Sequence, residues 1–171
     1  MNEALEVRDV AGTSRVVLDA AMEYCAQKLR LDGAQSVIDQ LKAGDGRVCS
    51  YCHYSVAKQV AAFLGTLDGN VKAAYIYDYD ATPQDLCLGN GAHGLPIHLL
   101  VWAERKTAAL KVMVETWDRA LAQGYADMID SRPSAHVLDV QVVDNADVQK
   151  RVGYGALLSS LHCPPVQLWS R

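Results

Sequence analysis

The first third of the chain carries two stretches in which apolar residues return at helical spacing. The first covers residues 13–31. Its apolar face carries Leu18, Met22, Cys25 and Leu29. A shorter helical stretch follows, and a glycine-rich break at residues 43–46 ends it. We expect residues 1–12 to be loosely packed and residues 1–48 to form an N-terminal helical extension.

From residue 49 on, helical and strand-like patterns alternate. Ser50 can cap a helix, and Gly124 is expected to end the long helix that starts at Lys106. The expected order is a helix at 50–67, strands at 71–77 and 97–103, a helix at 106–124, a strand at 136–143, a helix at 146–161 and a strand at 166–169. One mixed sheet of about four strands covered by helices satisfies this order, so we predict an α/β (α+β) fold for residues 49–171.

Charge and composition narrow the function classes. The 171 residues carry a net charge of −4 without a run of Lys and Arg, so neither nucleic acid nor an anionic membrane surface is an expected partner. No apolar stretch reaches the ~20 residues that cross a bilayer. Residues 1–15 mix charges and lack the apolar centre of a secretory signal, so we expect a cytoplasmic protein with reduced cysteines.

Candidate chemistry is concentrated where the strand at 71–77 ends. Asp78 and Asp80 follow this apolar run directly. Carboxylate oxygens are the ligands that hard cations such as Mg²⁺ prefer. The two aspartates are therefore candidate catalytic and metal-binding residues, although a solvated strand end is the simpler explanation of both.

A glycine-rich loop at residues 89–94 follows these aspartates. It leads into a strand rather than a helix, so it lacks the context of a phosphate-binding loop. A ligand beside this loop would be flanked by two histidines. The candidate ligand-binding residues are Tyr79, Gly91, His93 and His98.

Several local sequences and their order match one known family. A helix ending in Phe63-Leu64-Gly65 leads through a turn into the strand at 71–77. A later strand contains Leu99-Leu100-Val101, and a third strand carries Asp139. The chain over residues 54–169 thus resembles the minimal nucleotidyltransferase family, the small members of the polymerase-beta-like fold. This resemblance implies a nucleotidyltransferase-like mixed sheet.

The same resemblance indicates where the chemistry of the family is replaced. The family's first strand ends in Gly-Ser, which holds nucleotide phosphates, and Asp78 and Tyr79 stand at those positions. Its paired metal-binding carboxylates align with Pro96 and His98, and only the third carboxylate remains, as Asp139. Two-metal phosphoryl transfer needs several carboxylates. The resemblance therefore implies a catalytically degenerate member that acts as a nucleotide-, small-ligand- or protein-binding regulatory module, with no assigned cofactor.

Two enzyme interpretations remain open. In the first, Asp78, Asp80 and Asp139 share one magnesium ion, and the chain is an active metal-dependent nucleotidyltransferase with an altered site. In the second, the Asp78-x-Asp80 motif resembles the nucleophile motif of haloacid-dehalogenase-type phosphatases, in which magnesium lies between the two carboxylates. Asp144 and Asp147 would then supply the later acidic motif of such a phosphatase.

The segment Cys49-Ser-Tyr-Cys52-His53 matches the signature of covalent c-type haem attachment. The same cysteine pair could bind zinc or form a redox dithiol. Haem attachment requires export, and a structural zinc site requires four ligands, so we expect packed cysteines at the start of a helix. A homodimer is compatible with an exposed helical extension, and the sequence leaves this possibility open.

Overall fold

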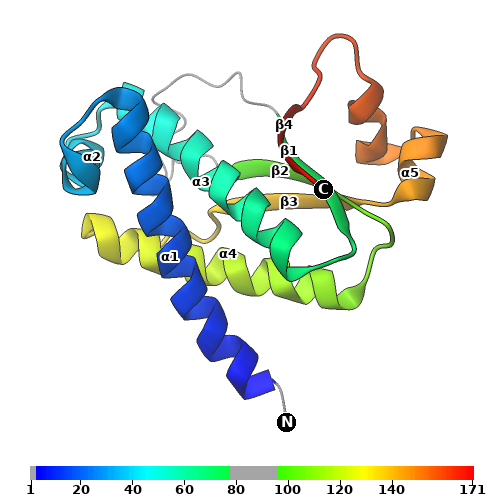
Figure 1. Ribbon diagram of the computed structural model, residues 1–171, viewed down its shortest axis with the longest axis horizontal. Helices are drawn as coiled ribbons and strands as arrows, with labels where there is room; N and C mark the ends of the chain where they lie inside the picture. The colour runs from blue at the N-terminus through cyan, green and yellow to red at the C-terminus, as the bar shows by residue number, and fades with distance from the viewer. Residues whose placement is uncertain (1–2, 78–95) are drawn as a thin grey trace.

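The computed structural model describes residues 3–77 and 96–171, which form a mixed four-stranded sheet with helices packed on it (Figure 1). The strands are β1 (Val71–Ile76), β2 (Ile97–Ala103), β3 (Leu138–Val143) and β4 (Val166–Ser170). Their order across the sheet is β3-β2-β1-β4. β1 is antiparallel to β2 and β4, whereas β2 and β3 are parallel and are connected through helix α4. The α+β fold predicted from the sequence is confirmed.

Two helices, α3 (Gly46–Leu67) and α4 (Ala108–Ile129), pack on the face of the sheet that is turned toward the viewer in Figure 1. α1 (Glu3–Leu29) crosses in front of both of them. α2 (Gly33–Lys42) lies at one end of this layer, and α5 (Asn145–Lys150) and the 3₁₀ helix η2 (Gly153–Ser159) lie at the other end of the molecule. Within the described part of the chain, none of the helices is long and apolar enough to cross a membrane.

The N-terminal helices share one hydrophobic core with the rest of the chain. Side chains of α1 are buried in the same cluster as those of α3, α4 and the inner face of the sheet. The largest fully buried members include Leu18, Met22, Leu64, Ile97, Leu99, Leu110, Trp117 and Leu121. Each such side chain contributes about 1.5–3 kcal/mol relative to leaving it in water. The described side chains of α1 and α2 are therefore continuous in packing with α3, α4 and the sheet.

Two helices begin earlier than the sequence pattern predicted. α1 already starts at Glu3, so the helix extends over most of the segment expected to be loosely packed. α3 starts at Gly46 because Asp45 is its N-cap, and the Asp45 carboxylate accepts a hydrogen bond of 2.9 Å from the backbone N–H of Val48. The prediction that Ser50 caps this helix was wrong. An apolar stripe marks the buried face of a helix but not its first turn.

Gly124 does not end α4, which continues to Ile129. A Cβ atom at position 124 would lie 2.9 Å from Cδ1 of Leu18, so the missing side chain lets α1 cross α4 closely. The helix instead ends at Asp130, which adopts a left-handed conformation with φ of 54°. The glycine thus serves helix packing rather than capping.

The predicted helix at 146–161 is split into α5 and η2. Arg151 and Gly153 both have positive φ, 52° and 51°, and this conformation ends α5 after Lys150. Gly155 then packs against the backbone of Asp147, where a Cβ atom would lie 2.6 Å from the carbonyl oxygen. The chain therefore folds back on itself here instead of continuing as one helix.

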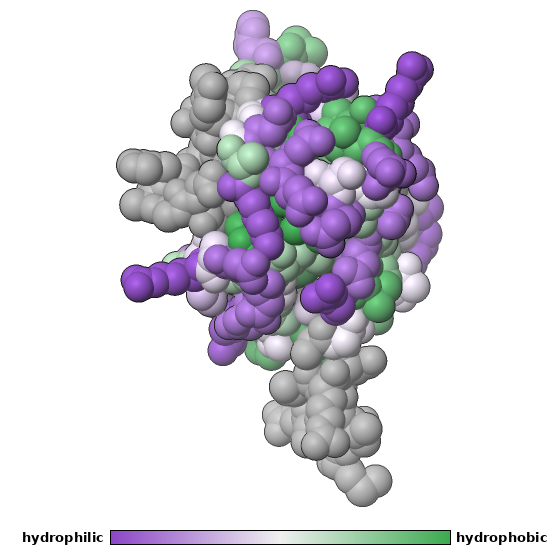
Figure 2. Space-filling model, turned by 90° about the vertical axis from the view of Figure 1, so that its left-hand side faces the viewer, coloured by the Kyte–Doolittle hydropathy of each residue, from purple (hydrophilic) through white to green (hydrophobic). Residues whose placement is uncertain are grey.

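The end of the molecule that carries α2 has a mostly hydrophilic surface. Figure 2 shows this end, and the hydrophobic areas visible on it are separate from one another. An ion pair of 2.6 Å between Lys42 and Asp130 links the last turn of α2 to the end of α4. The described surface at this end therefore offers polar groups rather than a broad apolar face.

Candidate functional site

A hydrogen-bonded histidine and aspartate lie at the end of the sheet where β2 and β3 begin. His98 and Asp139 are register partners on these two parallel strands. The Nδ1 atom of His98 lies 3.1 Å from Oδ2 of Asp139, and the Nε2 amide of Gln141 donates a hydrogen bond of 2.9 Å to Oδ1 of the same carboxylate. Both carboxylate oxygens of Asp139 therefore have a partner within the sheet.

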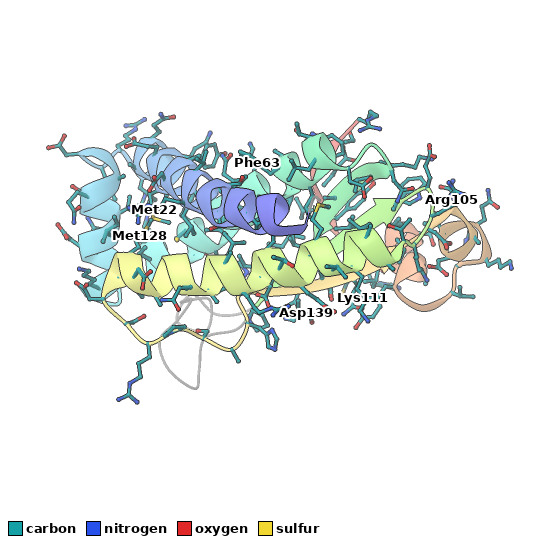
Figure 3. All side chains as sticks on the ribbon, turned by 90° about the horizontal axis from the view of Figure 1, so that it is seen from below. Met22, Phe63, Arg105, Lys111, Met128 and Asp139 are labelled. Atoms are coloured by element: carbon teal, nitrogen blue, oxygen red, sulfur yellow. The ribbon has the colours of Figure 1, made fainter. Side chains whose placement is uncertain are left out.

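The pair lies on the face of the sheet opposite the main helical layer. Along β3, Leu138 points into the core and Asp139 points away from it, because successive side chains of a strand alternate between faces. Figure 3 shows Asp139 projecting from β3 on the side away from α1. The side chains of His98 and Asp139 are 25% and 40% exposed, so a ligand can reach them.

Aromatic rings border this pair on the β1 side. The ring of Tyr77, which follows β1, lies 5.3 Å from the His98 ring and 5.7 Å from the Tyr154 ring, measured between centroids. Tyr77 belongs to a second apolar cluster on this face, with Leu100 and Val143 at its centre. Side chains of α5 and η2 cover that cluster, so this part of the face is closed.

Of the candidate residues named from the sequence, the structure brings His98 and Asp139 together. The others lie outside the described residues, and these are Asp78, Tyr79, Asp80, Gly91 and His93. Among the residues that are described, no three His, Cys, Asp or Glu side chains are grouped so that they could hold a metal ion. A carboxylate that orients an imidazole can support proton transfer or hydrogen bonding to a ligand.

A second histidine–aspartate pair, which the sequence pattern did not reveal, lies beside the first. Asp118 of α4 is buried, and its Oδ2 lies 2.7 Å from Nδ1 of His136. Its Oδ1 accepts hydrogen bonds of 2.8 Å from the backbone N–H groups of Val137 and Leu138. Asp118 therefore anchors the start of β3 and fixes the position of the neighbouring Asp139. Its sequence signal is a carboxylate within the apolar stripe of a helix.

A groove of about 700 Å³ lies between α4 and the start of β3. Its size is within the range of small-ligand sites. The residues that line it are Pro96, Val114, Glu115, Asp118, Arg119, Ala135, His136, Leu138, Asp139 and Val140. Asp139 thus belongs both to this groove, which we call the α4–β3 groove, and to the pair with His98.

Asp144 and Asp147 form a helix cap rather than a second acidic motif. The Asp144 carboxylate accepts from the backbone N–H of Asp147, and the Asp147 carboxylate accepts from the backbone N–H of Asp144, which is a capping box. Lys106 also forms an ion pair of 2.5 Å with Asp147. These contacts give the phosphatase interpretation no support.

The Asp147→Asn substitution is expected to reduce stability by less than about 1 kcal/mol near neutral pH, because asparagine keeps an oxygen for the Asp144 N–H but loses the partly exposed ion pair with Lys106. The hydrogen bond from Lys106 holds the pKa of Asp147 below its usual value. This stabilisation is therefore present above the unfolded-state pKa and is lost as pH falls through the lower folded-state pKa. Urea unfolding of both proteins should show a difference that narrows in strong acid. A difference that is constant with pH would contradict this role.

The cysteines of the helix-start segment pack inside the protein. Cys52 is a buried free thiol, so it forms no disulfide with Cys49. Burial raises the pKa of Cys52, and it raises the pKa of Cys25, a second buried free thiol, to about 11. Both thiols are therefore protonated at neutral pH and react slowly.

Alkylation of the folded protein at neutral pH is expected to label Cys163, which is exposed, and to spare Cys25 and Cys52. Mass spectrometry of digested protein can compare labelling before and after unfolding, and full labelling of all three after unfolding is the control. Rapid labelling of Cys52 in the folded protein would instead support a redox-active Cys49–Cys52 pair.

The chain is thus an α+β domain with a histidine–aspartate pair at one end of its sheet and an acidic groove beside it. Comparisons with protein-family models, with curated proteins and with solved structures each found no match.

Proposed function

We propose that this chain is a non-catalytic binding module built on a nucleotidyltransferase-like scaffold. The observation that carries the proposal is the pairing of Asp139 with His98 and Gln141. In the resembling family, the position of His98 belongs to a metal-binding carboxylate. Here an imidazole stands there and takes up one oxygen of Asp139, while Gln141 takes up the other.

This substitution changes what the site can bind. Two-metal phosphoryl transfer requires several carboxylates that hold Mg²⁺ ions against the phosphates. An imidazole is a weaker ligand for such hard cations. Because the Nδ1 N–H of His98 donates to Asp139, the Nε2 atom of the ring can accept a hydrogen bond from a ligand instead. The proposal is therefore recognition by hydrogen bonding and ring contacts at His98, without transfer chemistry.

Incubation with the four nucleoside triphosphates and Mg²⁺ or Mn²⁺ is expected to give pyrophosphate release at the background rate. Because Asp139 is not expected to hold a catalytic metal, the Asp139→Ala variant should show the same background. If a nucleotide is the ligand, it should raise Tm by similar amounts with Mg²⁺ and with EDTA, because the proposed site does not bind the nucleotide through a metal ion.

Two outcomes would replace this proposal with an enzyme. Metal-dependent nucleotide transfer that disappears in Asp139→Ala would establish an active nucleotidyltransferase with an altered site. Metal-dependent release of inorganic phosphate that disappears in Asp78→Asn would establish the phosphatase. His162→Ala replaces an exposed histidine and serves as the control variant. It should keep any activity that the parent protein shows.

A further inference from the structure

β3 is an edge strand of the described sheet. In the order β3-β2-β1-β4 it pairs with β2, and within the described chain no other strand lies on its outer side. Its four central residues, 139–142, are half-buried rather than buried. An edge strand presents backbone N–H and C=O groups that can pair with another extended chain.

The α4–β3 groove runs beside this edge. α4 forms one wall with residues 114–119, and β3 with the segment before it forms the other with residues 135–140. Val114, Leu138 and Val140 supply apolar surface between the two walls. A strand edge next to a helix-walled groove is the geometry in which extended peptides add to a sheet, because the backbone pairs with the edge while alternate side chains enter the groove.

The groove is acidic. Three carboxylates, those of Glu115, Asp118 and Asp139, face one guanidinium, that of Arg119, which leaves a formal charge of −2 when His136 is neutral. The hydrogen bonds from His136 and from two backbone N–H groups already satisfy Asp118. Asp139 accepts from His98 and Gln141. Glu115 lies 3.9 Å from the Nζ atom of Lys111 in an exposed ion pair, which is weak. The formal charge of the groove lining therefore still favours a cationic side chain.

We propose that the β3 edge and the α4–β3 groove bind an extended basic peptide segment of a partner protein, which adds to the sheet as a fifth strand. This inference rests on the proposed function as a binding module and names the class of its partner. A second copy of this chain fits less well, because twofold pairing of β3 would bring two acidic grooves together. A small organic cation would leave the strand edge unpaired.

The test uses an acetylated, amidated eight-residue peptide of alternating lysine and valine, added to ¹⁵N-labelled protein. Amide resonances of residues 138–143 and 114–119 are expected to shift. Glu115→Lys should weaken binding about tenfold, since it replaces an attraction by a repulsion at the groove. Glu104→Lys makes the same change of charge at an exposed position beyond the other end of β2, and it should leave the affinity within about twofold of the parent.

Two further peptides separate strand addition from charge attraction. Methylation of two consecutive central peptide nitrogens blocks both edges of the peptide while keeping its charge, and it should abolish the shifts in β3. An alternating glutamate–valine peptide should not bind. Equal binding of the methylated peptide, or equal weakening by Glu115→Lys and Glu104→Lys, would overturn the inference. The triphosphate assay tests the proposed function separately, so nucleotide transfer refutes that function even if the peptide binds.

Discussion

Replacing Asp118 by alanine is expected to destabilise the fold by about 3 kcal/mol, because the substitution leaves buried backbone donors without a partner. Asp118 is 6% exposed and accepts from the N–H groups of Val137 and Leu138 and from His136. Both backbone donors lie at the start of β3, which pairs with β2 through the hydrogen bond from Ile97 N to Val137 O. Loss of this anchor should therefore loosen the end of the sheet that holds His98 and Asp139.

Urea unfolding followed by circular dichroism measures the effect, and two variants separate its parts. Asp118→Asn retains an oxygen for the two backbone N–H groups and is expected to cost about 1–2 kcal/mol. His136→Ala removes a side chain that is 71% exposed and should cost less than about 1 kcal/mol. If Asp118→Ala lost no more stability than His136→Ala, the hydrogen bonds from the backbone N–H groups of Val137 and Leu138 would not contribute measurably to stability.

The strands could be predicted from the sequence because their signal is local. Apolar runs at 71–77, 97–103 and 136–143 match β1, β2 and β3 closely, since both faces or one face of each run must be buried. Helix ends were predicted less well. Glycine often ends a helix, but Gly124 lies inside α4, where the close approach of Leu18 from α1 requires a residue without a side chain.

The candidate site could be predicted only in part. His98 and Asp139 were named one by one, yet the register between β2 and β3 that makes them partners is a long-range property. Asp118 and His136 are separated by 18 positions and lie on a helix and a loop, so no spacing rule connects them. The local sign in the sequence was a carboxylate, Asp118, beside Trp117 in the apolar stripe of α4, and the structure shows that both side chains are buried.

Replacing Gly65 by alanine is expected to destabilise the protein by about 2 kcal/mol, although glycine-to-alanine changes inside helices usually stabilise by up to about 1 kcal/mol. A Cβ atom at position 65 of α3 would overlap the indole ring of Trp169 in β4. The carbonyl of Gly65 also accepts a hydrogen bond of 3.2 Å from Nη2 of Arg171. α3 and β4 thus approach most closely at this position, and the indole ring of Trp169 has to move if a methyl group is added.

Two comparisons test that explanation by thermal and urea unfolding. Gly12 is a helix residue of α1, and a methyl group added to it would meet no atom within 4 Å, so Gly12→Ala should show the ordinary gain in stability. In a Trp169→Ala background the overlap is gone, and Gly65→Ala should then become neutral or stabilising. A loss of about 2 kcal/mol in both backgrounds would mean that the helix itself, and not its contact with β4, requires glycine at position 65.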